Sequence, residues 1–177
     1  MSTDSRYSNK ELAVVLDTAA LLAKYYRFAP RLSADILVPM GVVSEVKDAE
    51  NRLALEEAIN LNIVKVIAPQ KGFKEQAFKL ARSVGCLHKL SGADLEVVAT
   101  SLEVQRKYAK VIVITDDYEL QNLLLYIGVS FKPLRTRGIS ELRIFAAYCP
   151  VCKYVPSRPG EETCPLCGSK IIRARTT

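Results

Sequence analysis

The sequence lacks any apolar segment long enough to span a membrane. No run in its 177 residues approaches the ~18 apolar residues that a membrane helix needs. Its first residues, MSTDSRYSNKE, contain no apolar stretch of the kind found in a signal peptide. Low-complexity tracts and internal repeats are also missing, and the chain is 49% hydrophobic and 25% charged. We therefore expect a globular, cytoplasmic protein with a sizeable core and no membrane partner.

Histidine and cysteine are scarce outside the C-terminal region. His88 is the only histidine, so the chemistry that suits this chain is one that does not require a histidine base. Cys86 is the only cysteine before residue 149, and in a cytoplasmic protein such a residue is ordinarily a small buried apolar side chain.

Charge of both signs is present but unevenly distributed. Residues 1–130 hold 16 lysines and arginines against 16 aspartates and glutamates, whereas residues 131–177 hold 9 against 3. The C-terminal region therefore accounts for the whole net charge of +6. This excess predicts an anionic partner, with nucleic acid the first candidate. The alternative is a basic tail that serves only solubility.

Apolar runs in the first 132 residues predict strands that alternate with helices. We expect strands over 12–16, 36–39, 63–68, 111–115 and 129–132. Helical periodicity predicts helices over 17–28, 41–62, 73–84, 93–108 and 118–126. The strands are continuously apolar, as in sheets that are buried on both faces. The pattern predicts an α/β fold with a central parallel sheet between helical layers.

Acidic residues follow the strands of this predicted sheet, at the edge where ligands bind in such folds. The candidate acids lie after a strand or near a helix start: Asp17, Glu45, Asp94, Asp116 and Asp117. Each has a structural interpretation when taken singly, because aspartates favour helix N-termini and a glutamate can lie on a solvated helix face. These acids are therefore candidates for structural roles as well as for catalysis.

The adjacent pair Asp116–Asp117 favours a functional interpretation. A helix cap needs one acid, which leaves one member of the pair unexplained, and neighbouring carboxylates repel each other. A divalent cation would offset that repulsion. Mg²⁺ and Mn²⁺ take oxygen ligands and often act on phosphates, so the matching reaction is metal-assisted hydrolysis of a phosphodiester. A phosphatase with an aspartate nucleophile in a D-x-D motif fits less well, because Ala19 occupies the second acidic position.

Four of the five cysteines form two C-x₂-C pairs separated by eleven residues: Cys149, Cys152, Cys164 and Cys167. This spacing predicts a four-sulfur structural zinc site, and disulfides are disfavoured in a reducing cytoplasm. The surrounding loops carry basic residues (Lys153, Arg158, Lys170, Arg173 and Arg175) that suit RNA binding. Tyr148 and Tyr154 are available either for base stacking or for the small core of this module.

Four motifs resemble those of PIN nuclease domains. They are an Asp-Thr after the first strand, a glutamate in an S-E-V context, L-S-x-A-D at a helix start and V-I-T-D-D-Y after a strand, and together they cover residues 12–132. The resemblance implies a PIN-like three-layer α/β/α fold and a Mg²⁺- or Mn²⁺-dependent ribonuclease. It carries over Asp17, Glu45, Asp94, Asp116 and Asp117 as catalytic residues, with Asp17, Asp94 and Asp117 as cation ligands. The family has a threonine or serine two residues before its aspartate, which aligns Thr115 with Asp117 and leaves Asp116 second to it.

The combination with a zinc ribbon resembles the Nob-one endonucleases of archaea and eukaryotes, as does the D-D-Y-x-x-Q-N segment from Asp116 to Asn122. That resemblance implies cleavage of precursor small-subunit ribosomal RNA at its mature 3′ end, on the pre-ribosomal particle. Two alternatives stay open: a non-catalytic RNA-binding assembly factor and a toxin-type PIN ribonuclease. We expect a PIN domain over 1–132, a basic linker over 133–148 and a zinc ribbon over 149–177.

Overall fold

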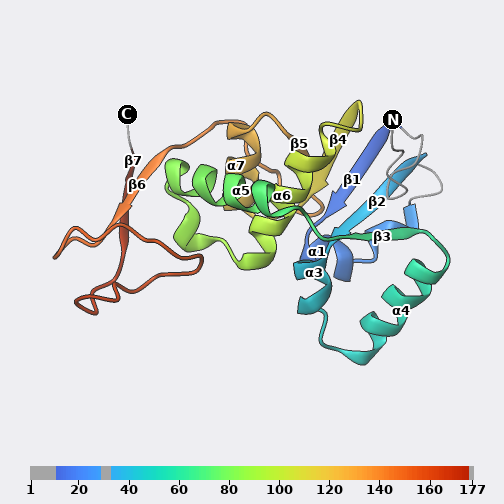
Figure 1. Ribbon diagram of the computed structural model, residues 1–177, viewed down its shortest axis with the longest axis horizontal. Coiled ribbons are helices and arrows are strands. Elements are labelled where there is room, and N and C mark those ends of the chain that lie inside the picture. Colours follow the sequence, from blue (N-terminus) through green and yellow to red (C-terminus); the bar gives the residue numbers. More distant parts are fainter. Residues whose placement is uncertain (1–10, 29–32, 176–177) are drawn as a thin grey trace.

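The computed structural model describes residues 11–28 and 33–175 (Figure 1). Residues 1–10, for which the sequence predicts no signal peptide, lie outside the described residues. Within the described ranges, no helix is long and apolar enough to cross a membrane.

A five-stranded parallel sheet forms the centre of the molecule. Its strands lie in the order β3-β2-β1-β4-β5. Their bounds are β1 Leu12–Leu16, β2 Ala34–Pro39, β3 Val64–Ile67, β4 Lys110–Ile114 and β5 Ser130–Lys132. All five predicted strands are confirmed within one or two residues at each end, and the parallel sheet of the predicted α/β fold is confirmed with them.

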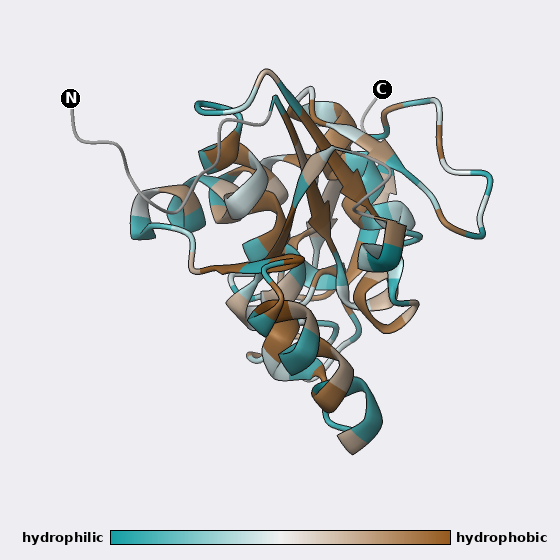
Figure 2. Ribbon diagram, turned by 90° about the vertical axis from the view of Figure 1, so that its right-hand side faces the viewer, coloured by the Kyte–Doolittle hydropathy of each residue, from teal (hydrophilic) through white to brown (hydrophobic). Residues whose placement is uncertain are grey.

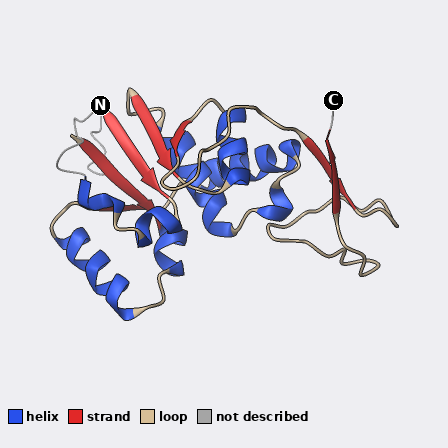
Figure 3. Ribbon diagram, turned by 180° about the vertical axis from the view of Figure 1, so that it is seen from behind, coloured by secondary structure: helices blue, strands red, loops and turns tan. Residues whose placement is uncertain are grey.

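Helices cover both sides of this sheet (Figures 1 and 3). The α-helices are α1 Thr18–Leu22, α3 Met40–Glu45, α4 Ala49–Asn60, α5 Lys71–Val84, α6 Gly92–Val104 and α7 Tyr118–Tyr126, with short 3₁₀ helices at Tyr25–Phe28 (η1) and Leu87–Lys89 (η2). The three-layer arrangement predicted from the sequence is therefore confirmed.

Two predicted helices are each broken into two pieces. The helix predicted over 17–28 stops at Leu22, because Lys24 adopts a left-handed conformation with φ 55°, and the chain resumes as η1. The helix predicted over 41–62 is interrupted at Val46, whose ψ of 101° is extended. Asp48 then starts α4 as its N-cap by accepting a 2.9 Å hydrogen bond from the backbone N–H of Asn51. Periodicity does not show either break, since the apolar residues on both sides of each break keep helical spacing.

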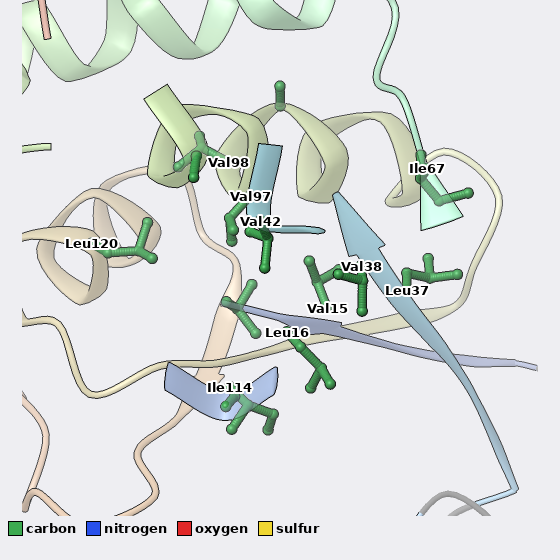
Figure 4. Close-up of a cluster of buried hydrophobic side chains, with 14 of the residues drawn as sticks. Val15, Leu16, Leu37, Val38, Val42, Ile67, Val97, Val98, Ile114 and Leu120 are labelled. Atoms are coloured by element: carbon green, nitrogen blue, oxygen red, sulfur yellow. The ribbon is translucent and has the colours of Figure 1, made fainter. Parts of the chain in front are cut away.

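The core lies between the sheet and the helices. In Figure 2 the strands of the sheet are predominantly hydrophobic, and every residue of β2 is buried. Figure 4 shows Val97 and Val98 of α6 over the strands that carry Val15 and Val38. Adjacent strand residues point to opposite faces, so the sheet is buried on both sides, as its continuous apolar sequence predicts.

The C-terminal region forms a second, two-stranded sheet of β6 (Phe145–Tyr148) and β7 (Ile172–Arg175). These strands pair antiparallel, with Phe145 opposite Arg175 and Tyr148 opposite Ile172. They stand apart from the central sheet (Figure 3). All four cysteines of the C-x₂-C pairs lie on the chain between these strands, so the strands bring the ends of the cysteine-bearing segment together.

Candidate functional site

The strand order reverses between β1 and β4, which is the position where open α/β sheets have a crevice at the carboxyl ends of their strands. From β1 the chain moves outward to β2 and β3 on one side, and then crosses to β4 and β5 on the other. Such a reversal leaves an opening at the carboxyl ends of the two central strands, where ligands bind in open α/β sheets. Asp17 directly follows β1, and Thr115, Asp116 and Asp117 directly follow β4. The backbone N–H of Asp17 donates to the carbonyl of Ile114 at 3.3 Å, so the two segments lie side by side.

Asp17 is the most buried acid at this crevice, with 5% of its surface exposed. It is the N-cap of α1 and accepts a 2.7 Å hydrogen bond from the backbone N–H of Ala20. Burial raises the pKa of its carboxyl group, and repulsion by Asp94 and Asp116 raises it further. Hydrogen bonds with Thr115 and Ala20 lower this pKa, but they do not cancel the increase. A negative charge here is costly unless a cation compensates it.

Thr115 connects the two central strands at the site. Its hydroxyl oxygen accepts from the backbone N–H of Asp117 at 3.1 Å, and its side chain also hydrogen-bonds to the carboxylate of Asp17. Asp117 caps α7, because its Oδ1 accepts from the backbone N–H groups of Glu119 at 2.7 Å and Leu120 at 3.0 Å. No hydrogen bond to its Oδ2 is formed by the described residues, which leaves that oxygen available to a ligand.

Asp116 points to a different part of the chain. Its Oδ1 accepts hydrogen bonds from the backbone N–H groups of Leu134, Arg135 and Thr136, at 2.9, 3.0 and 3.1 Å. These bonds lower the pKa of the Asp116 carboxyl group, with Arg135 the largest contributor. The pair Asp116–Asp117 was expected to include one acid without a structural role, but both have one, because Asp117 caps α7 and Asp116 binds the linker after β5.

Asp94 and Glu45 reach the crevice from helices. Asp94 forms a capping box with Ser91: its Oδ2 accepts from the Ser91 backbone N–H at 2.7 Å, and its own N–H donates to the Ser91 hydroxyl at 3.1 Å. Burial raises the pKa of Asp94, and repulsion by Asp117 and Glu45 raises it further. Glu45 ends α3 with its side chain exposed and accepts a short hydrogen bond from the hydroxyl of Thr18, the neighbour of Asp17.

The structure thus places the acids Asp17, Glu45, Asp94 and Asp117 in one region, where Asp94 is within electrostatic range of the other three. Asp17 and Asp94 repel each other, and Asp94 in turn is repelled by Asp117 and Glu45. Within the described residues, none of the four forms an ion pair with a lysine or arginine. Four carboxylates without a basic partner form an oxygen-rich donor set that suits Mg²⁺ or Mn²⁺. Their oxygen atoms are not gathered into a preassembled cation site, because the one group of three or more closely spaced candidate ligands in the described residues is made of cysteines.

Two residues that the sequence did not single out hold α3 in place. Gly41, in the first turn of α3, donates its backbone N–H to Oε2 of Glu96 on α6 at 2.7 Å. A Cβ at Gly41 would lie 2.9 Å from that oxygen and 3.3 Å from the Cα of Ala93. The absence of a side chain at Gly41 therefore lets α3 approach α6, and this contact places Glu45 near the site. The sequence contains no specific signal for Glu96, because the same helix also carries Asp94 and Glu103.

The four cysteines form a compact cluster at the other end of the molecule. Their sulfur atoms lie within 4.8 Å of one another, and this is the one such group of three or more candidate ligands in the part of the chain that the structure describes. The Cys149–Cys167 and Cys152–Cys164 sulfurs are 3.4 Å apart, too far for a disulfide. A tetrahedral zinc site has sulfurs about 3.8 Å apart, from a Zn–S distance of about 2.3 Å. Hydrogen bonds from Ser169 lower the pKa of Cys167, whereas hydrogen bonds with the other thiols, Cys164 first, raise the pKa of Cys152. Binding of zinc would therefore require the cluster to release protons.

The two tyrosines of this region have different surroundings. Tyr154 packs against the buried cluster of Cys149, Cys164 and Ile171, so it belongs to the small core of the cysteine module. Tyr148 is half-buried, and the Lys153 ammonium lies 5.4 Å from the centre of its ring. Of the two residues considered for base stacking, Tyr154 therefore has a structural role.

Comparison with known proteins gives consistent results. The profile of a family described as the PIN domain of ribonuclease matches residues 14–104. Ribonuclease VapC3 of Aeropyrum pernix is 40% identical over 71% of this chain and 88% of its own length. Endoribonuclease Nob1 of Pyrococcus abyssi is 38% identical over 91% of this chain and 92% of its own. Endoribonuclease Nob1 of Methanothermobacter thermautotrophicus is 30% identical over the same shares.

Proposed function

Because this chain belongs to the PIN-domain endoribonucleases, and among them to the Nob1 family with its C-terminal zinc ribbon, we propose that it cleaves precursor small-subunit ribosomal RNA at the mature 3′ end. The chain is an endoribonuclease; the proposal adds its substrate and its dependence on Mg²⁺ or Mn²⁺. One observation supports the cation dependence: four acids without a basic partner lie in the region at the ends of β1 and β4, and their mutual repulsion adds to burial in raising the pKa values of Asp17 and Asp94.

Each residue of the site has its own role in the proposed reaction. Asp17, Asp94 and Asp117 would hold the cation, which when bound supplies charge to the phosphate and activates a water. Thr115 fixes the relative positions of Asp17 and Asp117 through its two hydrogen bonds. We assign the exposed Glu45 carboxylate to orient the attacking water and accept its proton, with the Thr18 hydroxyl holding one of its oxygens. Asp116 holds the linker and adds its negative charge near Asp17.

The cysteine cluster would bind a structural zinc ion, because four thiolates leave no coordination position open for catalysis. The basic residues around it give the ribbon a charge suited to RNA on the pre-ribosomal particle. The division into a nuclease domain over 1–132, a linker over 133–148 and a ribbon over 149–177 stays a prediction, as does the cytoplasmic location.

A toxin-type ribonuclease is the second candidate, because the VapC3 relative is 40% identical. The match to Nob1 of P. abyssi extends over more of the chain, 91% against 71%. A match of that extent includes part of the last 29 residues, which carry the cysteines. A VapC1 relative also covers 90% of this chain, but at 26% identity against 38% and 30% for two Nob1 relatives, so what supports ribosomal RNA maturation is the higher identity of the long Nob1 matches.

The test compares the wild-type protein with Asp17→Asn on RNA that spans the precursor 3′ end, with Mn²⁺, with Mg²⁺ and without either. We expect cation-dependent cleavage at the mature end, reduced at least about 100-fold in Asp17→Asn, since asparagine keeps the N-cap but lowers the negative charge at the cation site. Asp48→Asn is the matched control, because Asp48 also caps a helix but lies outside the acid set. Its cleavage rate should equal that of the wild type.

Three results would contradict this proposal in different ways. Undiminished cleavage by Asp17→Asn, in a preparation free of other nucleases, would refute the assigned site. Tight RNA binding without cleavage by the wild type would indicate a non-catalytic assembly factor. Cleavage of unrelated RNAs at the same rate as the precursor would favour the toxin-type function.

A further inference from the structure

A hollow of about 660 Å³ lies between α7, the linker and the first and last strands of the ribbon. Its lining includes Tyr118 and Asn122 of α7, Ser140 and Arg143 of the linker, and Phe145 and Arg173 of β6 and β7. The linker passes over α7 on its way to β6 (Figure 1). This volume is within the range of small-molecule sites. The lining also includes the carboxylates of Glu119 and Glu141, and its aromatic, hydroxyl and cationic groups are of the kinds that contact a nucleotide.

The linker wall of this hollow is held in a defined position by side chains of α7. Gln121 is fully buried, and its Oε1 accepts from the Ile139 backbone N–H at 3.1 Å. Asn122, 4% exposed, donates to the Arg143 carbonyl at 2.6 Å and accepts from the Arg143 N–H at 2.8 Å. Buried amides are costly to leave unpaired, so these bonds fix the linker. The hollow is therefore pre-formed, as binding sites generally are.

The wall of the hollow formed by β6 and β7 is also held by side-chain contacts. The Arg173 guanidinium makes two contacts with the Glu119 carboxylate, at 2.6 and 2.5 Å, and lies 4.3 Å from the centre of the Phe145 ring. The charge of Arg173 is thus neutralised by Glu119. Arg143 is exposed and forms no ion pair with any described residue, so its charge is available to an anion.

The hollow begins one residue from the proposed cation site. Tyr118 directly follows Asp117 and is 52% exposed, and the Glu119 N–H donates to Asp117 Oδ1 at 2.7 Å. When the scissile phosphate of an RNA strand lies at the acids, a neighbouring nucleotide of that strand therefore lies at the opening of the hollow.

We propose that this hollow is a nucleotide subsite of the nuclease, in which a base next to the scissile phosphate stacks on Tyr118 while Arg143 contacts a phosphate. The inference rests on the proposed function for the position of the scissile phosphate. Stacking on Tyr118 accepts any base, so the subsite would position single-stranded RNA next to the cleaved bond. The hydroxyl of Ser140 is available for a hydrogen bond to the edge of a base, which could give a sequence preference.

The first test measures binding of a single-stranded RNA oligonucleotide from the precursor 3′ end to the zinc-loaded full chain, without Mg²⁺ or Mn²⁺. Tyr118→Leu should weaken binding about 5- to 100-fold, the effect of losing one stacked base, and Tyr118→Phe should stay within about two-fold of the wild type. Tyr126→Leu is the matched control, because Tyr126 is an exposed tyrosine at the other end of the same helix. Unchanged binding by Tyr118→Leu would overturn the proposal.

A second measurement addresses the phosphate contact. Arg143→Gln should reduce the slope of log affinity against log salt by about 0.7, the value for one phosphate contact on a single strand, and Arg52→Gln on α4 should leave the slope unchanged. Equal slopes for the two variants would contradict the contact.

Photo-crosslinking separates this proposal from the catalytic one. RNA that carries 5-iodouridine next to the cleavage position should crosslink to peptides that contain Tyr118 or Phe145. Crosslinks confined to the ribbon loops, or a protein partner that competes for the hollow while RNA does not, would refute the subsite. Because the two binding measurements require no cleavage, a failure of the proposed cation site leaves their outcome unaffected.

Discussion

At the scale of single residues, Asp17 illustrates a conflict between stability and function. Its Oδ1 caps α1, which stabilises the helix, but its charge is buried near Asp94 and Asp116 and so opposes folding. An asparagine at this position retains the cap and removes the charge. Without a divalent cation, we therefore expect Asp17→Asn to be more stable than the wild type at neutral pH, by about 1 kcal/mol or about 2–4 °C in Tm.

The pH dependence of this difference follows from the sign of the pKa shift. The folded pKa of Asp17 lies above the ordinary value of 3.8, so the native state binds the proton more tightly than the unfolded state does. Stability of the wild type is therefore lost as pH rises from 3.8 through the raised pKa, and the difference from Asp17→Asn should disappear below 3.8.

Thermal melting from pH 3 to 8 measures this, and Mn²⁺ should raise the Tm of the wild type more than that of the variant. Asp48→Asn is the control, since hydrogen bonds from Asn51 lower the pKa of Asp48 and its contribution is lost at low pH instead. A variant less stable than the wild type at every pH would show that the buried charge is already compensated within the protein.

The sequence predicted which acids lie at the carboxyl edge of the sheet, but it did not predict what each carboxylate contacts. Thr115 and Asp117 lie at the expected places, because their positions follow from the end of one strand. The partners of Asp116 are 18 to 20 residues further along the chain, in a segment without regular structure. Periodicity and local motifs give no information on such a contact, so the role of Asp116 could come only from the three-dimensional structure.

At the scale of elements, the position of α3 depends on close packing against α6. Gly41→Ala would place a Cβ against Glu96 and the backbone of Ala93. Glu96 cannot move freely, because its Oε1 contacts the Lys74 ammonium at 2.5 Å while its Oε2 accepts from Gly41. We expect Gly41→Ala to lower the free energy of unfolding by about 1–3 kcal/mol, as overpacking does, and to reduce the cleavage rate by moving Glu45.

Chemical denaturation and single-turnover cleavage measure the two effects. Gly72→Ala is the matched control, since nothing lies within 4 Å of a Cβ at Gly72 in the first turn of α5. That variant should be as active as the wild type and at least as stable. Full activity in Gly41→Ala would show that α3 can shift without moving Glu45 from the site.

Elements were predicted well where one strong local signal defines them. The strands and the bounds of α7 follow from continuous apolar runs and from a capping aspartate. The breaks after Leu22 and Glu45 depend on backbone conformations at Lys24 and Val46, neither of which is a glycine or a proline. Residue type alone therefore could not predict that these helices are short.

At the scale of the whole molecule, the nuclease and the cysteine module are docked through few contacts. The pair between Arg173 and Glu119 is largely shielded, with side-chain exposures of 29% and 23%. The pair between Lys89 and Glu162 is more exposed, at 35% and 58%. Backbone packing adds to them, because a Cβ at Gly85 would lie 1.8 Å from the Phe145 carbonyl oxygen. The sequence predicted two modules but no contact between them, since an ion pair 54 residues apart leaves no local pattern.

These two ion pairs should differ in their effect on docking. Exposed pairs contribute at most about 1 kcal/mol, whereas breaking a shielded bidentate pair leaves a charge without its partner and costs more. We expect Arg173→Glu to increase hydrogen exchange in β6 and β7, through repulsion from Glu119 and loss of packing on Phe145. Lys89→Glu, the matched control across the same interface, should increase hydrogen exchange in these two strands much less.

The charge-exchanged double variant Glu119→Arg/Arg173→Glu should restore part of the protection from exchange, because the ion pair is reformed with reversed signs. Equal exchange in both single variants would mean that the backbone contact at Gly85, rather than the shielded pair, holds the ribbon against the nuclease.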